Sequence, residues 1–238
     1  MARTSGFSDL IIQEDQDYIL INKPPFISTL DDRNDPANIL ALAREYEPEA
    51  QVCHRLDKET SGILAIARNA EAYRHLSMQF EHRQVKKIYH AVSDGVHHYV
   101  DEEVTAPILK LSDGTVRISA KGKEATTFFS TLEIFARHTL LECRPLTGRM
   151  HQIRVHLTVL KAPITGDTLY GGKPFFVSSV KRDFRVKKGT EEQPLIKRLA
   201  LHAFSLEFEG LHGGKVNIQA PYPKDFTALL RQLSSHKG

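Results

Sequence analysis

The chain has 238 residues, of which 41% are hydrophobic and 26% charged, with a formal net charge of +3, as in an ordinary globular protein. No stretch approaches the roughly 18 consecutive apolar residues of a membrane helix, and the first residues lack the apolar core of a signal peptide. The two cysteines, Cys53 and Cys143, form no CxxC pair, which favours two buried thiols in a reducing compartment. We therefore expect a cytoplasmic protein that does not contact a membrane.

The charges are spread unevenly along the chain. Residues 1–60 carry 6 basic and 12 acidic groups, whereas residues 61–238 carry 26 basic and 17 acidic groups. A basic region can attract a polyanion, but the same charges also suit a solvated surface that has no partner. The charge distribution alone leaves both interpretations open.

Hydrophobic periodicity and turn residues predict a chain that alternates between helices and strands. In chain order, we expect two strands within 10–23, a helix over 37–47, a strand over 63–68, a helix over 70–82, a strand over 87–92, an antiparallel pair over 126–135 and 138–144, a helix over 149–161, strands over 199–208 and 215–219, and a helix over 223–233. Local signals support these bounds: Pro24-Pro25 stops a strand, Asp35-Pro36 starts a helix, and Asn69 caps the next one. The pattern predicts an α+β fold with a mixed, largely antiparallel sheet and flanking helices and loops, in one domain over residues 1–238.

The segment 173–198 differs from the rest of the chain, because it has little periodicity and is too long for an ordinary connection. From residue 181 on, it carries seven basic and three acidic residues. It is either a disordered surface loop or an insertion that grips a polyanion through phosphate contacts, and we prefer the second interpretation. The candidate phosphate-binding residues are Lys181, Arg182, Arg185, Lys187 and Lys188.

The sequence HRLDKETSG at residues 54–62 places Asp57 in a polar turn directly before the apolar run 63–67. A carboxylate is ionised at neutral pH without a helper base, so Asp57 is a candidate nucleophile. Most aspartates in turns are structural, however, and Asp57 could equally cap its own turn.

Two further motifs follow. In KIYHA at 87–91, Tyr89 shares a strand face with Ala91, whose small side chain leaves room for a flat base to stack on the ring; a core tyrosine explains the pattern equally well. In TGRMHQIRVHL at 147–157, Arg154 falls at the edge of a buried helix face, where a guanidinium needs a carboxylate partner. His151 and His156 are five residues apart without an HExxH pattern, so we expect no metal.

In this order, the three motifs resemble the signature of the RluA-type RNA pseudouridine synthases: HRLDxxTSG, KxYxA, and TGRxHQIRxHL with PIxGDxxYGG at 163–172. Leu201-His202-Ala203 also matches, so the resemblance runs from about residue 22 to residue 221. Two departures stand out. The strand expected after residue 10 leaves no room for the small N-terminal RNA-binding domain of many relatives. Lys161-Ala162-Pro163 stands where relatives usually have a glycine before the proline.

The resemblance implies an enzyme that isomerises specific uridines of structured RNA, ribosomal or transfer RNA, to pseudouridine without a cofactor. Asp57 would be the nucleophile, either on the sugar or through a glycal intermediate, and Arg154 would pair with it. Tyr89 would stack on the base and accept a proton, while Arg55 would fill the gap left by the flipped base. Further RNA contacts are expected at His54, Thr60 and Arg149.

Two other classes of function compete with this one. A catalytically silent RNA-binding protein or RNA chaperone on the same scaffold would not need Asp57, Tyr89 and Arg154 to be intact. An acid–base hydrolase would need a second carboxylate near Asp57, and Glu59 points elsewhere in a turn. We expect a monomer without an obligate protein partner; the sequence does not name the RNA or the uridine.

Overall fold

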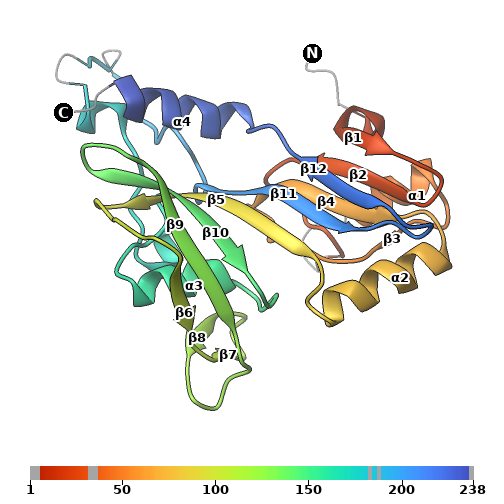
Figure 1. The fold of residues 1–238 in the computed structure, drawn as a ribbon. Helices are drawn as coiled ribbons and strands as arrows, with labels where there is room; N and C mark the ends of the chain where they lie inside the picture. Colours follow the sequence, from red (N-terminus) through yellow and green to blue (C-terminus); the bar gives the residue numbers. More distant parts are fainter. Residues whose placement is uncertain (1–5, 32–36, 182–183, 187–188, 236–238) are drawn as a thin grey trace. The chain divides into compact units, whose positions relative to one another are not determined.

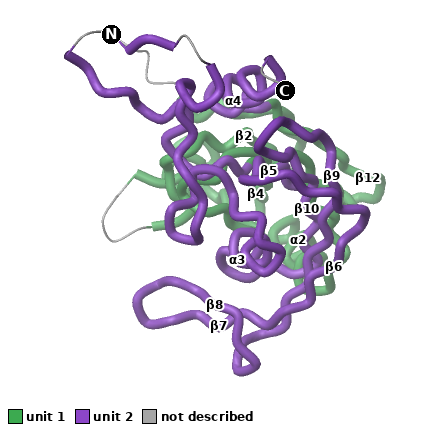
Figure 2. Tube along the Cα trace, turned by 90° about the vertical axis from the view of Figure 1, so that its left-hand side faces the viewer, with its two compact units in different colours: residues 1–88, 202–221 green, residues 89–201, 222–238 purple. Residues whose placement is uncertain are grey.

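The structure is a computed structural model that describes residues 6–31, 37–181, 184–186 and 189–235. Figure 1 shows the helices and strands of the chain. The chain divides into two compact units, which Figure 2 draws in different colours. Unit 1 comprises residues 1–88 and 202–221, and unit 2 comprises residues 89–201 and 222–238. Each unit is therefore assembled from segments that lie far apart in the sequence, and the single domain expected over 1–238 stays a prediction.

Unit 1 is built around one strand whose seven residues are all buried, β4. Its strands are β1 (Ile11–Glu14), β2 (Tyr18–Lys23), β3 (Gln51–Val52), β4 (Ser61–Ala67), β11 (Leu201–Glu209) and β12 (Lys215–Gln219), and its helices are α1 (Ile39–Tyr46) and α2 (Ala70–Glu81). β4 pairs antiparallel with β2 and parallel with β11, while β3 pairs with the end of β4. β1 and β12 extend the sheet as antiparallel partners of β2 and β11.

Both helices of unit 1 begin at an asparagine cap. Asn38 Oδ1 accepts the Ala41 N–H at 2.8 Å, and Asn69 Oδ1 accepts the Ala72 N–H at 2.8 Å. Such caps satisfy backbone donors that the first helical turn leaves unpaired. The expected cap at Asn69 is confirmed, whereas the expected helix start at Asp35-Pro36 lies outside the described residues.

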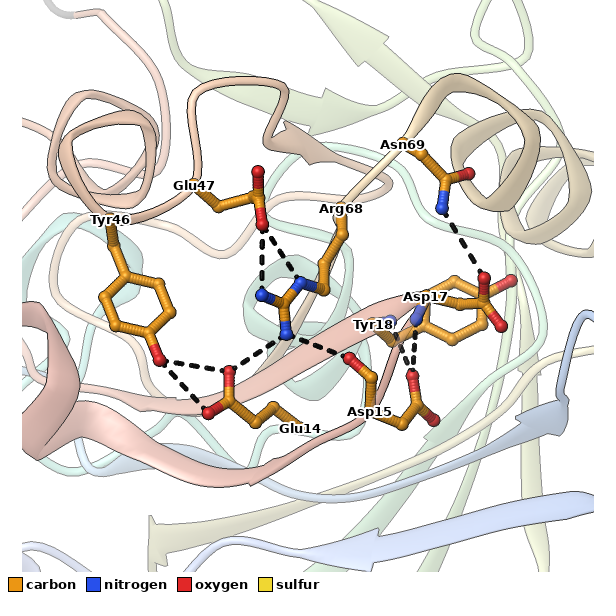
Figure 3. Close-up of polar contacts among 8 residues, drawn as sticks. All are labelled: Glu14, Asp15, Asp17, Tyr18, Tyr46, Glu47, Arg68 and Asn69. Carbon is orange, nitrogen blue, oxygen red and sulfur yellow. Dashed lines mark hydrogen bonds and ion pairs between the residues drawn. The ribbon is translucent and has the colours of Figure 1, made fainter.

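Arg68 follows β4 and connects it to two other segments of unit 1 (Figure 3). Its guanidinium contacts Glu47 at 3.0 Å, Glu14 at 3.3 Å and the carbonyl of Asp15 at 3.0 Å. The Tyr46 hydroxyl donates to Glu14 at 3.1 Å. Because the charged side chains are partly exposed, these contacts fix the ends of the elements more than they add stability.

Gly62 allows the parallel strands β4 and β11 to approach closely. Its φ is +117°, and a Cβ at this position would lie 2.1 Å from the Ala203 carbonyl oxygen. Any side chain would both clash with that backbone and occupy a conformation that L-residues avoid. The glycine that ends the HRLDKETSG motif is thus required by the sheet.

Unit 2 has its own sheet and its own helices. Its strands are β5 (Lys86–Asp94, in this unit from Tyr89), β6 (Glu102–Thr105), β7 (Ile108–Lys110), β8 (Val116–Ile118), β9 (Thr126–Ile134) and β10 (His138–Pro145), and its helices are α3 (Gln152–Val159) and α4 (Lys224–Ser235). β5, β10, β9 and β6 pair antiparallel in this order, and β7 pairs with β8 as a separate hairpin. Side chains of β5, β6, β9, β10, α3 and α4 form one buried cluster, which includes Phe129, Leu141, Leu157 and Phe226.

The expected α+β fold with a largely antiparallel sheet is confirmed, and β9 with β10 forms the expected antiparallel pair. The sequence patterns missed the short strands β3, β6, β7 and β8. No helix in the described ranges is both long and apolar enough to span a membrane.

Helix α3 is shorter than the expected 149–161, because left-handed residues stand on both sides of it. His151 precedes it at φ 50°, and Lys161 follows it at φ 55°. A non-glycine residue in this conformation costs about 1–2 kcal/mol, which glycine avoids. A glycine at position 161 would avoid this cost.

The segment 173–198 is anchored at both ends in the core of unit 2. Phe175 and Ile196 are 2% and 1% exposed and belong to the buried cluster. Between them, the described part contains one short 3-10 turn, Val177–Ser179. Between these anchors, the described part exposes Lys181 and Arg185.

Candidate active site

Asp57 lies in a turn between β3 and β4 that hydrogen bonds hold in place. The Thr60 N–H donates to the Asp57 carbonyl at 3.0 Å and closes the turn. The neighbouring Leu56 is buried, and both of its backbone groups pair with the Thr29 hydroxyl, at 2.9 and 3.1 Å. The Asp57 side chain is partly buried, and Arg55, two residues earlier, is exposed.

A buried lysine supports the same turn. Lys23, the last residue of β2, is 0% exposed. Its Nζ donates to the carbonyls of Pro24, Ile27 and Lys58, at 3.0, 2.9 and 3.3 Å. A buried ammonium is costly unless its three donors are satisfied, so these contacts draw the turn onto the end of β2. The sequence patterns did not predict the role of Lys23, although a lysine that ends a largely apolar strand is a recognisable signal.

His54 continues the pairing along β4 where β3 has ended. Its Nε2 accepts the Ala65 N–H at 3.0 Å, and its ring stacks on Phe80 with the centroids 4.6 Å apart. Nε2 must be unprotonated to accept, and burial, assisted by the Lys87 charge, lowers the pKa of His54 to about 3. These contacts position the turn that carries Asp57, and the expected RNA contact of His54 stays a prediction.

We expect His54 to make folding less stable as the solution is acidified. The folded ring stays neutral down to a pKa of about 3, whereas the unfolded ring titrates near 6.5. Between these values the unfolded state binds more protons, so the contribution is complete above pH 6.5 and is lost as the pH falls towards 3. It changes by up to about 1.4 kcal/mol per pH unit. His54→Gln retains an acceptor for the Ala65 N–H and should flatten this dependence in urea unfolding between pH 4 and 7. Parallel curves for the two proteins would contradict this role.

The two residues before Gly62 are buried. Thr60 is 2% exposed, and its hydroxyl has no hydrogen-bond partner among the residues that the structure describes. Ser61 Oγ lies 2.9 Å from His202 Nδ1, while His202 Nε2 lies 3.0 Å from the Ala220 carbonyl. Because Nε2 faces an acceptor, it carries the hydrogen, and Nδ1 accepts from Ser61. The late Leu201-His202-Ala203 motif therefore supports the strand that follows Asp57.

The second group of expected site residues belongs to unit 2. Tyr89 lies on β5 opposite Cys143 of β10 and packs against the buried cluster. Arg154, on α3, forms a two-pronged ion pair with Asp167, with Nε to Oδ2 at 2.7 Å and Nη2 to Oδ1 at 2.8 Å. Both side chains are less than a tenth exposed, and paired hydrogen bonds of this kind are among the stronger contacts in proteins.

Tyr170 completes the surroundings of Arg154. The guanidinium carbon lies 4.9 Å from the Tyr170 ring centroid, and the Tyr170 hydroxyl lies 2.8 Å from His151 Nδ1. The loop that carries these residues is held by a bond from the Gly172 N–H to the Asp167 carbonyl at 2.9 Å. The motif GDxxYGG contains Asp167 and Tyr170, but the sequence patterns did not predict their roles. The available signal was an aspartate among glycines that follows a helix with a buried arginine. The pairing of Arg154 with Asp57 stays a prediction, since the two residues belong to different units.

Gln152 fixes the start of α3. Its Oε1 accepts from the Thr147 hydroxyl at 2.6 Å and from the Arg149 N–H at 2.9 Å. The Arg149 side chain is exposed, and its Nε donates to the Glu124 carbonyl at 3.1 Å. His156 uses both ring nitrogens within unit 2, and burial lowers its pKa. Among the described residues, no group of three or more histidines, cysteines or acids is arranged to hold a metal ion.

The basic residues of the segment 173–198 differ in their exposure. Lys181 and Arg185 are exposed, whereas Arg182, Lys187 and Lys188 lie outside the described residues. Arg198 is 2% exposed and pairs with Asp225, Nε to Oδ2, at 2.7 Å. Arg198 is one of the seven basic residues of the segment, but its buried ion pair makes it a structural residue and not a candidate for phosphate contact.

A scan of family models matches residues 17–158 to "RNA pseudouridylate synthase". Among curated proteins, the chain is 34% identical to ribosomal large subunit pseudouridine synthase D of Haemophilus ducreyi, covering 94% of this chain and 70% of that protein. It is 38% identical to synthase D of Xylella fastidiosa, over 94% and 69% of the two chains. It is 34% identical to synthase C of Salmonella typhi, over 99% and 73%.

Two human solved structures share the fold. Human RNA pseudouridylate synthase domain containing 4 superposes with a TM-score of 0.72 at 26% identity, covering 96% of this chain and 94% of that one. Human RNA pseudouridylate synthase domain containing 1 gives a TM-score of 0.67 at 28% identity, with 90% and 83% covered.

Proposed function

The chain belongs to the RNA pseudouridylate synthase family, and from that premise we propose that it converts specific uridines of large-subunit ribosomal RNA to pseudouridine. Relatives more than 30% identical over nearly the whole chain are named for that substrate. The observation that carries the proposal is Asp57, presented in a turn that Thr29 and Lys23 hold through backbone contacts. A nucleophile held by its own backbone needs no further ordering when the substrate arrives.

The proposed reaction breaks the N1–C1′ bond of uridine, turns the base and forms a C5–C1′ bond. The hydrogen that leaves C5 is balanced by the one that N1 gains, so the reaction consumes no oxidant, reductant or water. The base must first leave its stack, which costs least in loops and bulges. We therefore place the target uridine in an unpaired position of the ribosomal RNA.

The ionised Asp57 carboxylate either attacks C1′ or promotes loss of a proton from C2′ in a glycal route. Tyr89 stacks on the turned base and accepts the departing proton, and the exposed Arg55 fills the space that the base leaves. Arg154 keeps Asp57 ionised, in addition to its contact with Asp167. The exposed Arg149, Lys181 and Arg185 are the described residues proposed to contact RNA phosphates.

The cellular setting is part of the same proposal. Cys53 and Cys143 both carry free thiols, which suits a reducing cytoplasm. We propose that the chain acts there as a monomer, without an obligate protein partner.

Pseudouridine mapping tests this function. The full chain is incubated with unmodified large-subunit ribosomal RNA and, separately, with unmodified transfer RNA. Carbodiimide-dependent stops of reverse transcriptase are then read in both pools. We expect new stops at one or a few uridines of the ribosomal RNA. Stops in transfer RNA alone would replace the substrate, and RNA binding without stops in either pool would favour the silent RNA-binding protein.

A further inference from the structure

A basic groove runs along α4 in unit 2, and none of the residues proposed for the reaction lines it except Lys181. The groove encloses about 600 Å³. Three cations line it, Lys181, Lys224 and Arg231, together with hydroxyl-bearing residues that include Thr227 and Ser235, and its described lining contains no acid.

The orientation of this surface is set by the core. With 3.6 residues per turn, Lys224, Arg231 and Ser235 fall on one face of α4. The opposite face carries Phe226 and Leu229, both 0% exposed and part of the buried cluster of unit 2. Burial of the apolar face therefore holds the basic face outwards.

The charges of the groove are not neutralised by neighbouring acids. Lys181, Lys224 and Arg231 form no ion pair with any described residue. Asp225, which follows Lys224, is bound to Arg198 through both carboxylate oxygens, at 2.7 and 3.1 Å. A helix face that is merely solvated usually mixes charges of both signs. Here two segments far apart in the sequence bring three cations and no acid to one concave surface.

We infer that the α4 groove binds the phosphate backbone of the RNA substrate and acts as a second anchoring surface. The nucleotides that it binds lie away from the target uridine in the RNA sequence. This inference rests on the proposed function, which makes the substrate a polyanion. Lys181, Lys224 and Arg231 neutralise phosphates, and the hydroxyl of Thr227 donates to a phosphate oxygen. Such contacts set the position and affinity of the RNA without reading its sequence. Through Lys181, the segment 173–198 contributes one phosphate contact to this surface.

The test is a triple charge reversal, Lys181→Glu with Lys224→Glu and Arg231→Glu. The control reverses three exposed basic residues of unit 2 outside the groove, Lys110→Glu with Lys121→Glu and Arg137→Glu. Both triples change the net charge equally. Binding to large-subunit ribosomal RNA transcribed in vitro is measured from 50 to 300 mM salt in the Asp57→Asn background. Turnover is measured with Asp57 intact.

We expect the groove triple to lower the slope of log K against log salt by about 2–3, since each lost phosphate contact removes just under one. Its KM for RNA should rise at least about tenfold with kcat unchanged, and the neutral triple with glutamines should lose the same slope. The control triple should change the slope by less than one. A groove triple with wild-type slope and KM, or an equal loss in the control, would overturn the inference. Wild-type protein that forms no pseudouridine would instead count against the proposed function.

Discussion

Replacing Asp57 with asparagine should abolish pseudouridine formation while leaving the fold and RNA affinity nearly unchanged. The amide matches the shape of the carboxylate but cannot act as an anionic nucleophile, so turnover should fall at least about a thousandfold. The contacts that hold the turn use the Asp57 carbonyl, the Leu56 backbone and the Lys58 carbonyl. These contacts survive the substitution, because none of them involves the carboxylate.

The matched control is Glu59→Gln, the same change from carboxylate to amide two residues away at an exposed position of the same turn. Both variants are compared with wild type by carbodiimide mapping, by RNA binding and by thermal unfolding. Clear turnover by Asp57→Asn would remove Asp57 from the nucleophile role. Equal loss in Glu59→Gln would mean that the integrity of the turn, and not the Asp57 charge, limits the reaction.

Asp167→Ala should destabilise the protein by about 3–5 kcal/mol. The substitution leaves the Arg154 guanidinium, on a side chain 7% exposed, without the carboxylate that binds its Nε and Nη2. Removing one partner of a buried ion pair is penalised heavily, whereas removing both charges costs far less. Denaturant unfolding followed by circular dichroism measures the loss.

The double variant Arg154→Leu with Asp167→Leu separates charge from packing. It should regain most of the stability that Asp167→Ala loses, because neither charge remains in the interior. An Asp167→Ala protein within about 1 kcal/mol of wild type would show that water or another group takes over the contact.

Local patterns in the sequence were sufficient for the longer elements. The Asn69 cap and the apolar spacing after it predicted α2, and the alternation over 126–144 predicted β9 and β10. The missed strands β3, β6, β7 and β8 have two to four residues, too few to display a period. The pairing of β3 and β6 is decided by neighbours farther along the chain, as with Val52 of β3 against Ile66 of β4.

The candidate site shows the same difference between what local patterns predict and what distant contacts decide. Motifs named Asp57, Tyr89 and Arg154 because their residue types carry recognisable chemistry. The supporting contacts were missed because they join residues far apart in sequence, such as Lys23 Nζ with the Lys58 carbonyl, 35 residues away. Asp167 lies 13 residues from Arg154, beyond the reach of helical periodicity. Patterns identify residues with chemical roles, whereas tertiary packing decides which groups orient them.

The parallel pairing of β4 with β11 has a consequence for the order in which the protein assembles during translation. Ser61 and His202 are 141 residues apart. At roughly 5–20 residues per second, a ribosome needs about 7–28 s to supply that length. In the nascent chain, the locally encoded β3 and His54 can already cover the part of β4 from Ala65 to Ala67. On the edge of β4 that faces β11, the backbone groups of Ser61 and Gly62 stay unpaired until β11 emerges. Premature association between nascent chains would therefore begin at this edge.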